Sequence, residues 1–484
     1  MTTTDSTPSI VWFRQDLRLA DNPALSAAVA RGGPVLPLYI LDEETPGPWA
    51  PGGASRWWLH HSLAALAKDL AALGAPLVLR RGGAEQVLEK VIEETGAGAV
   101  FWNRCYEPFA IARDTRIKAA LQDLGLTAES SNAALLFEPW IPKTKSGGPF
   151  KVFTPFWKHL LALGDVEAPL PRPGKMPLGA TAEGDKLEDW SLLPAKPDWA
   201  GGLREAWTPG EAGALARLEA FLQDGIEGYG EARDLPDRIG TSRLSPHLHW
   251  GEISPRQIWQ AARHRSAASG RAASDTESYL RELGWREFSY HLLFHWPEIP
   301  ESNWKASFDA FPWREDEAGF RAWTQGRTGY PIVDAGLREL WQSGWMHNRV
   351  RMIAASFLIK DLLVHWRRGE DWFWDTLVDA DLANNAASWQ WVAGSGADAA
   401  PFFRIFNPVT QGRKFDPAGR YVRKWLPELA GLPDSVIHAP WEADAATLAA
   451  ASVELGKTYP RPIVDHAAAR KRALAALQAI KTEA

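Results

Sequence analysis

The stretch SIVWF at residues 9–13, followed by NPALSAAVA at residues 22–30, decides the fold of the N-terminal part of the chain. The first stretch is a continuous apolar run rich in β-forming residues, which is typical of a strand buried in a parallel sheet. The second stretch is rich in alanine and has the length of a helix. A strand that leads into a helix indicates the start of a βαβ unit.

The same alternation continues through the first part of the chain. Strand-like apolar runs recur at 35–41, 76–79 and 99–102, and periodic helical stretches lie at 56–73 and 84–94. This rhythm predicts a five-stranded, mostly parallel sheet in an α/β domain. No strand is followed by the glycine pattern of a Rossmann dinucleotide site or of a P-loop, so neither site is expected here.

The chain of 484 residues is too long for one hydrophobic core, because chains beyond roughly 250–300 residues usually split into domains. Residues 165–213 are rich in proline, glycine and aspartate, as in a connection between domains. Beyond them the strong patterns have helical period, for example at 345–363. We expect an N-terminal α/β domain at 8–140, a linker at 141–213 and an all-helical domain at 214–484.

Composition limits the class of protein. The net charge of −6 argues against a surface covered in positive charge, so any nucleic-acid site must be local. The sequence contains no long uncharged apolar run and no signal-peptide pattern at its start, which predicts a cytoplasmic protein with no membrane partner. The 26 tryptophans exceed the needs of an ordinary core and suggest rings that stack on a flat ligand or relay electrons.

A hydroxyl-rich motif, TSRLSP, occupies residues 241–246. Its Ser245 and Pro246 are typical of an N-cap and the first position of a helix. Free N–H groups at such a helix start, together with Arg243, suit a diphosphate. A plain capped helix is the alternative.

An acidic and amide cluster, DADLANN, occupies residues 379–385. It is no calcium-binding EF-hand loop, because Asn384 and Gln390 stand where that loop needs glycine and glutamate. Carboxylates and amides bind ring N–H groups and sugar hydroxyls, so a ribose, flavin or adenine partner is one interpretation. A loop that caps the next helix is the other.

Two predicted helices carry polar side chains among apolar ones. Glu282 and Trp285 lie three apart and share a face, with Arg286 next in the chain. A surface ion pair with a core tryptophan is the plain alternative. Arg349 and Arg351 stand at the start of another apolar helix, where an anion or a carboxylate should meet them. The histidines lack the spacing of ligands, so no metal site is predicted.

Five motifs in order resemble one family, the photolyase and cryptochrome flavoproteins. They are WFRQDLRLADN at 12–22, TSRLS at 241–245, GYPIVD at 329–334, GWMHNRVR at 344–351 and FRIFNP at 403–408. The likeness spans nearly the whole chain. It implies an α/β domain joined by a long linker to a helical domain that binds FAD.

The resemblance implies a U-shaped FAD and the residues that hold it. The phosphates and ribityl chain would be held by Tyr229, Thr241, Ser242, Arg243, Leu244 and Ser245. The isoalloxazine and sugar would be surrounded by Arg286, Asn348, Arg351, Asp379 and Asp381. Asn385 would face flavin N5, as in photolyases that favour the fully reduced cofactor.

The resemblance also implies DNA containing a cyclobutane pyrimidine dimer as the partner. Residues matching the positions that contact the flipped dimer are Glu282, Trp285, Asn348, Met352 and Trp391, with Arg349 on a phosphate. The two tryptophans offer flat walls, and Glu282 can hydrogen-bond a base carbonyl and stabilise a radical anion. The (6-4) photolyases have a paired histidine in this pocket, whereas residues 346–349 read MHNR. A further basic rim, or a solvated face, is expected at Arg404, Arg413, Lys414, Arg423 and Lys424.

Trp389, Trp366 and Trp313 match the tryptophan chain through which the family photoreduces oxidised FAD. The implied activity is light-driven repair, by electron transfer from excited, reduced FAD to the dimer. The main alternative is a cryptochrome photoreceptor, which a long C-terminal tail or loss of Glu282 and Trp391 would favour. A flavin oxidoreductase would need a nicotinamide fingerprint, which is absent from the sequence.

The antenna chromophore is less well specified. Methenyltetrahydrofolate (5,10-methenyl) is the first expectation, with a deazaflavin or an empty site as alternatives. Many folate-binding members carry an Asn-Glu pair shortly after Tyr-Glu, but here Tyr106 and Glu107 are followed by PFA at 108–110. We expect the protein to be a monomer.

Overall fold

The structure is a computed structural model, and it describes residues 7–176, 181–269, 273–398 and 403–482. The chain divides into two compact units. Unit 1 comprises residues 1–227, 242–297 and 378–383, and unit 2 comprises residues 228–241, 298–377 and 384–484.

Unit 1 contains a five-stranded sheet in the order β3-β2-β1-β4-β5, with every neighbouring pair parallel. The strands are β1 (Ser9–Phe13), β2 (Val35–Leu41), β3 (Val78–Arg81), β4 (Ala99–Asn103) and β5 (Thr127–Ser131). The predicted sheet is therefore confirmed. The sequence did not single out β5 because this edge strand is polar and mostly solvent-facing.

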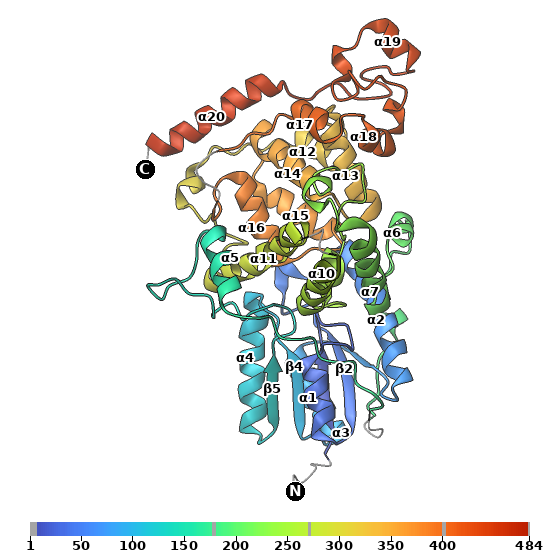
Figure 1. The fold of residues 1–484 in the computed structure, drawn as a ribbon, viewed down its shortest axis with the longest axis vertical. Helices are drawn as coiled ribbons and strands as arrows, with labels where there is room; N and C mark the ends of the chain where they lie inside the picture. The colour runs from blue at the N-terminus through green and yellow to red at the C-terminus, as the bar shows by residue number, and fades with distance from the viewer. Residues whose placement is uncertain (1–6, 177–180, 270–272, 399–402, 483–484) are drawn as a thin grey trace. The chain divides into compact units, whose positions relative to one another are not determined.

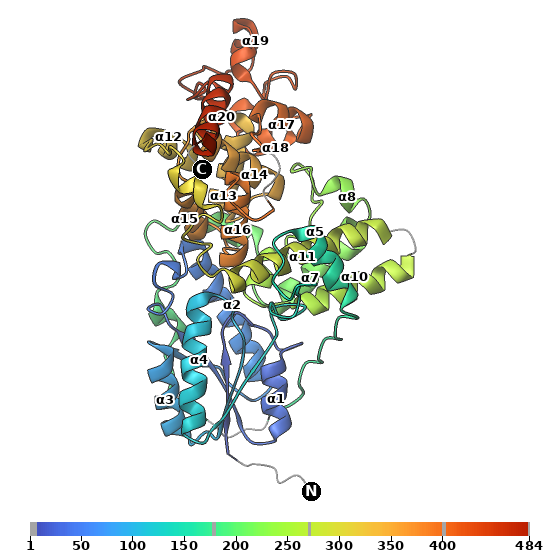
Figure 2. The same ribbon diagram turned by 90° about the vertical axis from the view of Figure 1, so that its left-hand side faces the viewer.

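Helices cover both faces of this sheet (Figure 2), with α3 and α4 on one side and α1 on the other. They include α1 (Pro23–Arg31), α2 (Gly53–Ala72), α3 (Ala84–Thr95) and α4 (Pro108–Asp123). Asn22 starts α1 by accepting a 3.0 Å hydrogen bond from the Leu25 N–H. Gly32 ends it with φ = 90°, a left-handed backbone that glycine adopts at little cost.

Unit 1 also contains helices from later in the chain. They are α5 (Phe153–Ala162), α6 (Gly201–Ala206), α7 (Glu211–Ala220), α9 (Ser245–His249), α10 (Pro255–Ser269) and α11 (Ala273–His295). Helix α5 lies within the segment expected to be a linker, yet it packs closely on α11. A Cβ added at Gly284 of α11 would lie 2.3 Å from the Trp157 ring, so this glycine permits the close approach.

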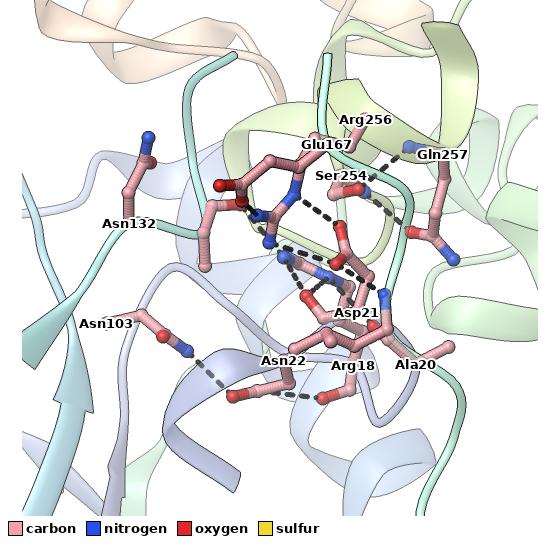
Figure 3. A network of polar contacts seen from close by, with 12 residues as sticks. Arg18, Ala20, Asp21, Asn22, Asn103, Asn132, Glu167, Ser254, Arg256 and Gln257 are labelled. Carbon is pink, nitrogen blue, oxygen red and sulfur yellow. Dashed lines mark hydrogen bonds and ion pairs between the residues drawn. The ribbon is translucent and has the colours of Figure 1, made fainter. Parts of the chain in front are cut away.

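A buried polar network ties the loop after β1 to α10 (Figure 3). The Asp21 carboxylate pairs with the Arg256 guanidinium at 2.9 and 3.1 Å, and it accepts a bond from the Leu170 N–H. Arg18 donates to the carbonyls of Asp21, Ala133 and Gly251. The Arg18–Gly251 and Asp21–Arg256 contacts join segments that are more than 200 residues apart in the sequence.

Unit 2 is mostly helical, as predicted (Figure 1). Its helices are α8 (Tyr229–Ala232), α12 (Glu317–Thr324), α13 (Pro331–Ser343), α14 (Asn348–Ser356), α15 (Trp366–Thr376), α17 (Pro408–Phe415), α18 (Arg420–Trp425), α19 (Ala445–Ala450), α20 (His466–Thr482) and the part of α16 (Leu382–Ala393) from residue 384 onward.

Within the stretch of helical period at 345–363, the helix begins only at Asn348 and changes to a π-helical turn at Phe357. Gly344 ends α13 with φ = 65°, and α14 begins only after His347, whose side chain accepts from the Arg349 N–H. Helix α14 then gives way to a π-helical turn at Phe357–Asp361. This turn contains the buried polar residues Lys360 and Asp361, whose groups need partners that a regular apolar helix face would not offer.

No helix in the described ranges combines the length and apolarity needed to cross a bilayer. Within those same ranges, no group of three or more His, Cys, Asp or Glu side chains is arranged to hold a metal ion.

Candidate functional site

Helix α11 carries Glu282, Trp285 and Arg286, as the sequence predicted. All three side chains are partly exposed. The Trp285 ring stacks on the ring of Phe153, with centroids 3.6 Å apart and planes at 9°. Phe153 was not identified from the sequence, because it is about 130 residues away in the chain and only the fold brings it to α11.

The structure brings Arg286 and Asp381 into one electrostatic environment. Asp381 is buried, accepts a hydrogen bond from the Tyr290 hydroxyl, and lies 3.9 Å from His249 Nδ1. Burial alone would raise its pKa, but His249 and the Arg286 guanidinium hold the pKa well below the usual range, so the carboxylate stays ionised. The sequence did not indicate His249 or Tyr290 as site residues. Tyr290 stands four residues after Arg286, a helical spacing that could have indicated it.

Glu287 is a second buried carboxyl of α11. Its Oε2 accepts hydrogen bonds from the backbone N–H groups of Leu136 and Phe137, at 3.0 and 3.3 Å. Burial raises its pKa to about 7 despite the neighbouring Arg286 charge. Glu287, which follows the candidate site residue Arg286, is thus neutral over much of the acidic pH range.

This pKa predicts a pH-dependent stability. Below pH 4.5 the carboxyl is protonated in both folded and unfolded chains, and between pH 4.5 and 7 only the folded chain keeps its proton. The stability that the protonated Glu287 carboxyl contributes is therefore lost as the pH rises from 4.5 to 7. Each unit between the two pKa values is worth about 1.4 kcal/mol, so Glu287→Gln should gain up to about 3 kcal/mol over wild type across this window.

Urea unfolding of the wild type and Glu287→Gln at pH 4.5, 6 and 7.5 checks this expectation. Glu277→Gln is the control and should follow the wild type, because the Glu277 side chain on the same helix is 44% exposed. Parallel curves for wild type and Glu287→Gln would contradict the raised pKa.

The motif at 241–246 lies at the boundary between the two units, with Thr241 assigned to unit 2 and Ser242 to unit 1. Ser245 is not the N-cap that was expected. Helix α9 starts at Ser245, its N-cap is Leu244, and no side chain caps it. Arg243 has φ = 51°, a left-handed backbone that costs about 1–2 kcal/mol for a non-glycine residue. Its guanidinium lies 5.2 Å from the Trp207 ring.

In unit 2, Asn385 lies on α16 and is buried. Its Nδ2 donates to the backbone carbonyl of Glu370 at 3.1 Å. The Glu370 side chain is itself fully buried, and both carboxyl oxygens lack a hydrogen-bond partner among the described residues. Burial and nearby Asp371 raise its pKa well above the ordinary value, so Glu370 is a neutral acid beside Asn385 that sequence reasoning missed.

The three tryptophans expected to form a chain all lie in unit 2. Trp389 is buried against Phe373 and Trp323, with ring centroids 4.9 and 6.2 Å away. Trp366 is fully buried, whereas Trp313 is partly exposed.

The outer two tryptophans share a neighbour that the sequence did not indicate. The His365 ring lies 5.6 Å from Trp366 and 4.9 Å from Trp313. Burial lowers the pKa of His365 to about 4, so this ring is neutral at physiological pH. Trp366 also donates from Nε1 to Asn303 Oδ1 at 2.9 Å, which holds its ring in place.

Helix α14 presents the next set of candidates. Asn348, its first residue, is exposed, and Met352 is partly exposed. Arg349 pairs with Asp234 at 2.7 Å and lies over the Phe415 ring. Arg351 donates from Nε to the Met346 carbonyl at 2.7 Å. Arg349 therefore meets a carboxylate, as expected, whereas Arg351 bonds a backbone carbonyl.

The expected basic rim is partly engaged. Arg413 pairs with Glu442, and Arg423 pairs with Asp434, both at 2.8 Å. Arg404 lies 5.5 Å from the Trp391 ring, and Lys414 and Lys424 lie over Phe415 and Trp425. A phosphate would have to compete with a carboxylate for the first two cations.

The candidate residues differ in burial. Those expected to contact DNA are all partly or fully exposed, namely Glu282, Trp285, Asn348, Arg349, Met352 and Trp391. Several of those expected to hold the cofactor are buried, namely Tyr229, Leu244, Asp379, Asp381 and Asn385. Among the other cofactor candidates, Ser245 and Asn348 are exposed, and the partly exposed ones are Thr241, Ser242, Arg243, Arg286 and Arg351.

Comparison with known proteins defines the class. The family model described as DNA photolyase matches residues 9–174, and that described as the FAD binding domain of DNA photolyase matches residues 279–479. The chain belongs to the photolyase/cryptochrome family, and its C-terminal part is the FAD-binding domain.

Individual relatives cover nearly the whole chain. The deoxyribodipyrimidine photo-lyase of Agrobacterium fabrum is 57% identical over 475 residues, which is 98% of each chain. Cryptochrome-1 of Arabidopsis thaliana is 43% identical, over 96% of this chain and 69% of its own. The crystal structure of a bacterial class III photolyase from Agrobacterium tumefaciens superposes with a TM-score of 0.96 at 56% identity, covering 99% of this chain and 98% of that one.

Proposed function

We propose that this protein is a light-driven lyase that splits cyclobutane pyrimidine dimers in DNA. The observation that carries the proposal is the half-exposed face of α11, on which Glu282 and Trp285 lie together. The chain that carries this face is 57% identical to a deoxyribodipyrimidine photo-lyase. The alternative of a surface ion pair does not account for a tryptophan that is left partly exposed while its other side is stacked.

Glu282, Trp285, Asn348, Met352 and Trp391 would contact the flipped dimer. The tryptophan rings provide flat apolar surfaces for two fused pyrimidines, and stacking of a base on an aromatic ring contributes about 1–3 kcal/mol. Glu282 would hydrogen-bond a base and stabilise charge that develops during ring opening. Arg349 would exchange its Asp234 partner for a phosphate of the backbone.

The buried polar groups suit FAD. Asp381 is an ionised carboxylate in a buried site, and such a group binds ring N–H or sugar hydroxyl donors strongly. The left-handed backbone of Arg243 supports a ligand-binding role for the 241–245 motif, because backbone strain of this kind clusters at functional sites. When bound in its reduced form, FAD supplies the light-absorbing electron donor.

The cofactor set is proposed residue by residue from the family motifs. Tyr229, Thr241, Ser242, Arg243, Leu244 and Ser245 would hold the phosphates and ribityl chain. Arg286, Asn348, Arg351, Asp379 and Asp381 would hold the flavin and sugar. Asn385, itself held by the Glu370 carbonyl, would face N5. Trp389, Trp366 and Trp313 would deliver electrons that restore the reduced cofactor.

We also propose the domain limits 8–140, 141–213 and 214–484, a monomeric state, a cytoplasmic location and methenyltetrahydrofolate as antenna. The folate proposal rests on the family alone. Glu107, which follows the tyrosine of the antenna motif, is buried and accepts from Gln15 Nε2 at 3.0 Å, so it is engaged within the protein.

Repair of a thymine-dimer oligonucleotide tests the function. The reduced, purified protein should repair the dimer in light and not in the dark. A Glu282→Ala, Trp391→Ala double variant should be about 100-fold slower or more, because removal of one group that stabilises transition-state charge costs that much. Glu277→Ala removes a carboxyl whose side chain is 44% exposed from the same helix, and it should repair at the wild-type rate.

One result of this assay would contradict the proposed function. If the wild type photoreduces its FAD yet leaves the dimer intact, repair is excluded and a cryptochrome photoreceptor takes its place. That result would agree with the 43% identity to Cryptochrome-1 of Arabidopsis thaliana.

A further inference from the structure

The stack of Phe153 on Trp285 joins two segments that the sequence keeps apart. Phe153 is the first residue of α5, is 5% exposed, and lies in unit 1 together with Trp285. Centroids 3.6 Å apart and planes at 9° mean that the rings are in van der Waals contact over their faces. Neither a water molecule nor a base fits between them.

This contact leaves only one face of the Trp285 indole available to a ligand. Phe153 covers the other face, and the Phe288 ring meets the indole edge-on, at 6.0 Å and 73°. Trp285 nevertheless remains partly exposed. The exposed part therefore lies outside the area of the indole that Phe153 covers.

Helix α5 packs closely on α11, which restricts movement of Phe153 away from Trp285. Trp157 packs directly over Gly284, the residue before Trp285. Phe156 contacts Phe288 and His291, with ring centroids at 5.2 and 5.1 Å. The two helices thus interlock through aromatic rings on both sides of the stack, and in close-packed interiors such a contact transmits displacement.

We propose that Phe153 is a positioning residue that fixes the plane of Trp285, and that it thereby sets the preference of the protein for dimer-containing DNA over undamaged DNA. The proposal rests on the role of Trp285 in the proposed function. Undamaged DNA binds mainly through phosphate charges, which do not depend on the orientation of an indole. A flipped dimer stacks on the ring, so its affinity depends on a preset plane.

The test is the dissociation constant for a duplex without a thymine dimer divided by that for the same duplex with the dimer. Phe153→Leu keeps a large apolar side chain but removes the flat support, and it should lower this ratio about three- to tenfold by weakening only the dimer complex. Phe153→Tyr retains the ring and should restore the wild-type ratio. Flavin absorbance, measured in parallel, should be unchanged in each variant.

Phe156→Leu is the matched control. Phe156 lies on the same helix and is also buried, and it contacts Phe288 and His291, whereas Phe153 stacks on Trp285 itself. This variant should lose stability comparably while keeping the wild-type ratio. If Phe153→Leu and Phe156→Leu give the same ratio, or if Phe153→Leu weakens both duplexes equally, Phe153 is merely a core residue and the inference is overturned.

A Trp285→Leu variant separates this inference from the proposed function. A lower ratio in Trp285→Leu together with a normal ratio in Phe153→Leu overturns only the positioning role. An unchanged ratio in Trp285→Leu removes Trp285 from the lesion site, and with it the basis for the inference.

Discussion

Replacement of Trp389 by phenylalanine is expected to abolish light-driven reduction of the bound flavin while leaving repair by chemically reduced protein intact. Phenylalanine keeps most of the apolar area that packs against Phe373 and Trp323, so the fold should persist. Its ring, however, is a far poorer electron donor than indole. Trp389 is only 2% exposed, so reductants in the solvent have little access to this position and do not replace it as electron donor.

The measurement is the absorbance change of oxidised flavin under blue light with a thiol reductant, followed by a repair assay after reduction with dithionite. Trp190→Phe, a buried tryptophan of unit 1 outside the predicted chain, should behave as wild type. Normal photoreduction in Trp389→Phe would exclude Trp389 as the electron donor. Loss of dithionite-driven repair would show instead that the substitution damages the site.

The second large effect concerns stability and the network of Figure 3. Asp21→Ala is expected to destabilise unit 1 by about 3–5 kcal/mol, because it leaves the buried Arg256 guanidinium without its paired carboxylate. The Glu167 contact cannot compensate, since Glu167 is 85% exposed and bonds Arg256 at 3.2 Å from the solvent side. Asp21 also has φ = 50°, which alanine tolerates less well.

Urea unfolding of wild type, Asp21→Ala and Asp21→Asn measures this loss. Asparagine tolerates the left-handed backbone and keeps a side-chain acceptor oxygen, so Asp21→Asn removes mainly the charge, whereas Asp21→Ala also removes the acceptor. Glu277→Ala is the matched control, because it breaks the pair of Arg263, on the same helix as Arg256, where both side chains are more than 40% exposed. That exposed pair should contribute at most about 1 kcal/mol. Equal losses in Asp21→Ala and Glu277→Ala would contradict the importance of burial.

Local pattern predicted the elements best where it was strong. Strands β1 and β2 were predicted at their observed bounds, since each is a continuous apolar run. The polar edge strand β5 and the break between Gly344 and Asn348 were not resolved, because a strand at a sheet edge needs little apolar character and a helix start depends on a cap. Helical spacing placed Glu282, Trp285 and Arg286 on one predicted helix, and the structure has all three on α11.

Residues that act through distant neighbours could not be predicted in this way. His249 and Tyr290 gather around Asp381, and His365 bridges Trp366 and Trp313, yet neither arrangement leaves a local pattern. The neutral state of Glu370 and the raised pKa of Glu287 result from desolvation by surrounding chain, which periodicity does not report.

The sequence by itself determined the parallel sheet, the helical C-terminal part and the family, because strand and helix periodicity and the five ordered motifs are local properties of the chain. Only the tertiary structure decided that α5, within the expected linker, packs on α11, that Phe153 covers one face of Trp285, and that Asp21 pairs with Arg256. Those contacts join residues more than 100 positions apart. Their geometry follows from how whole elements fill space together, which no short stretch of sequence encodes.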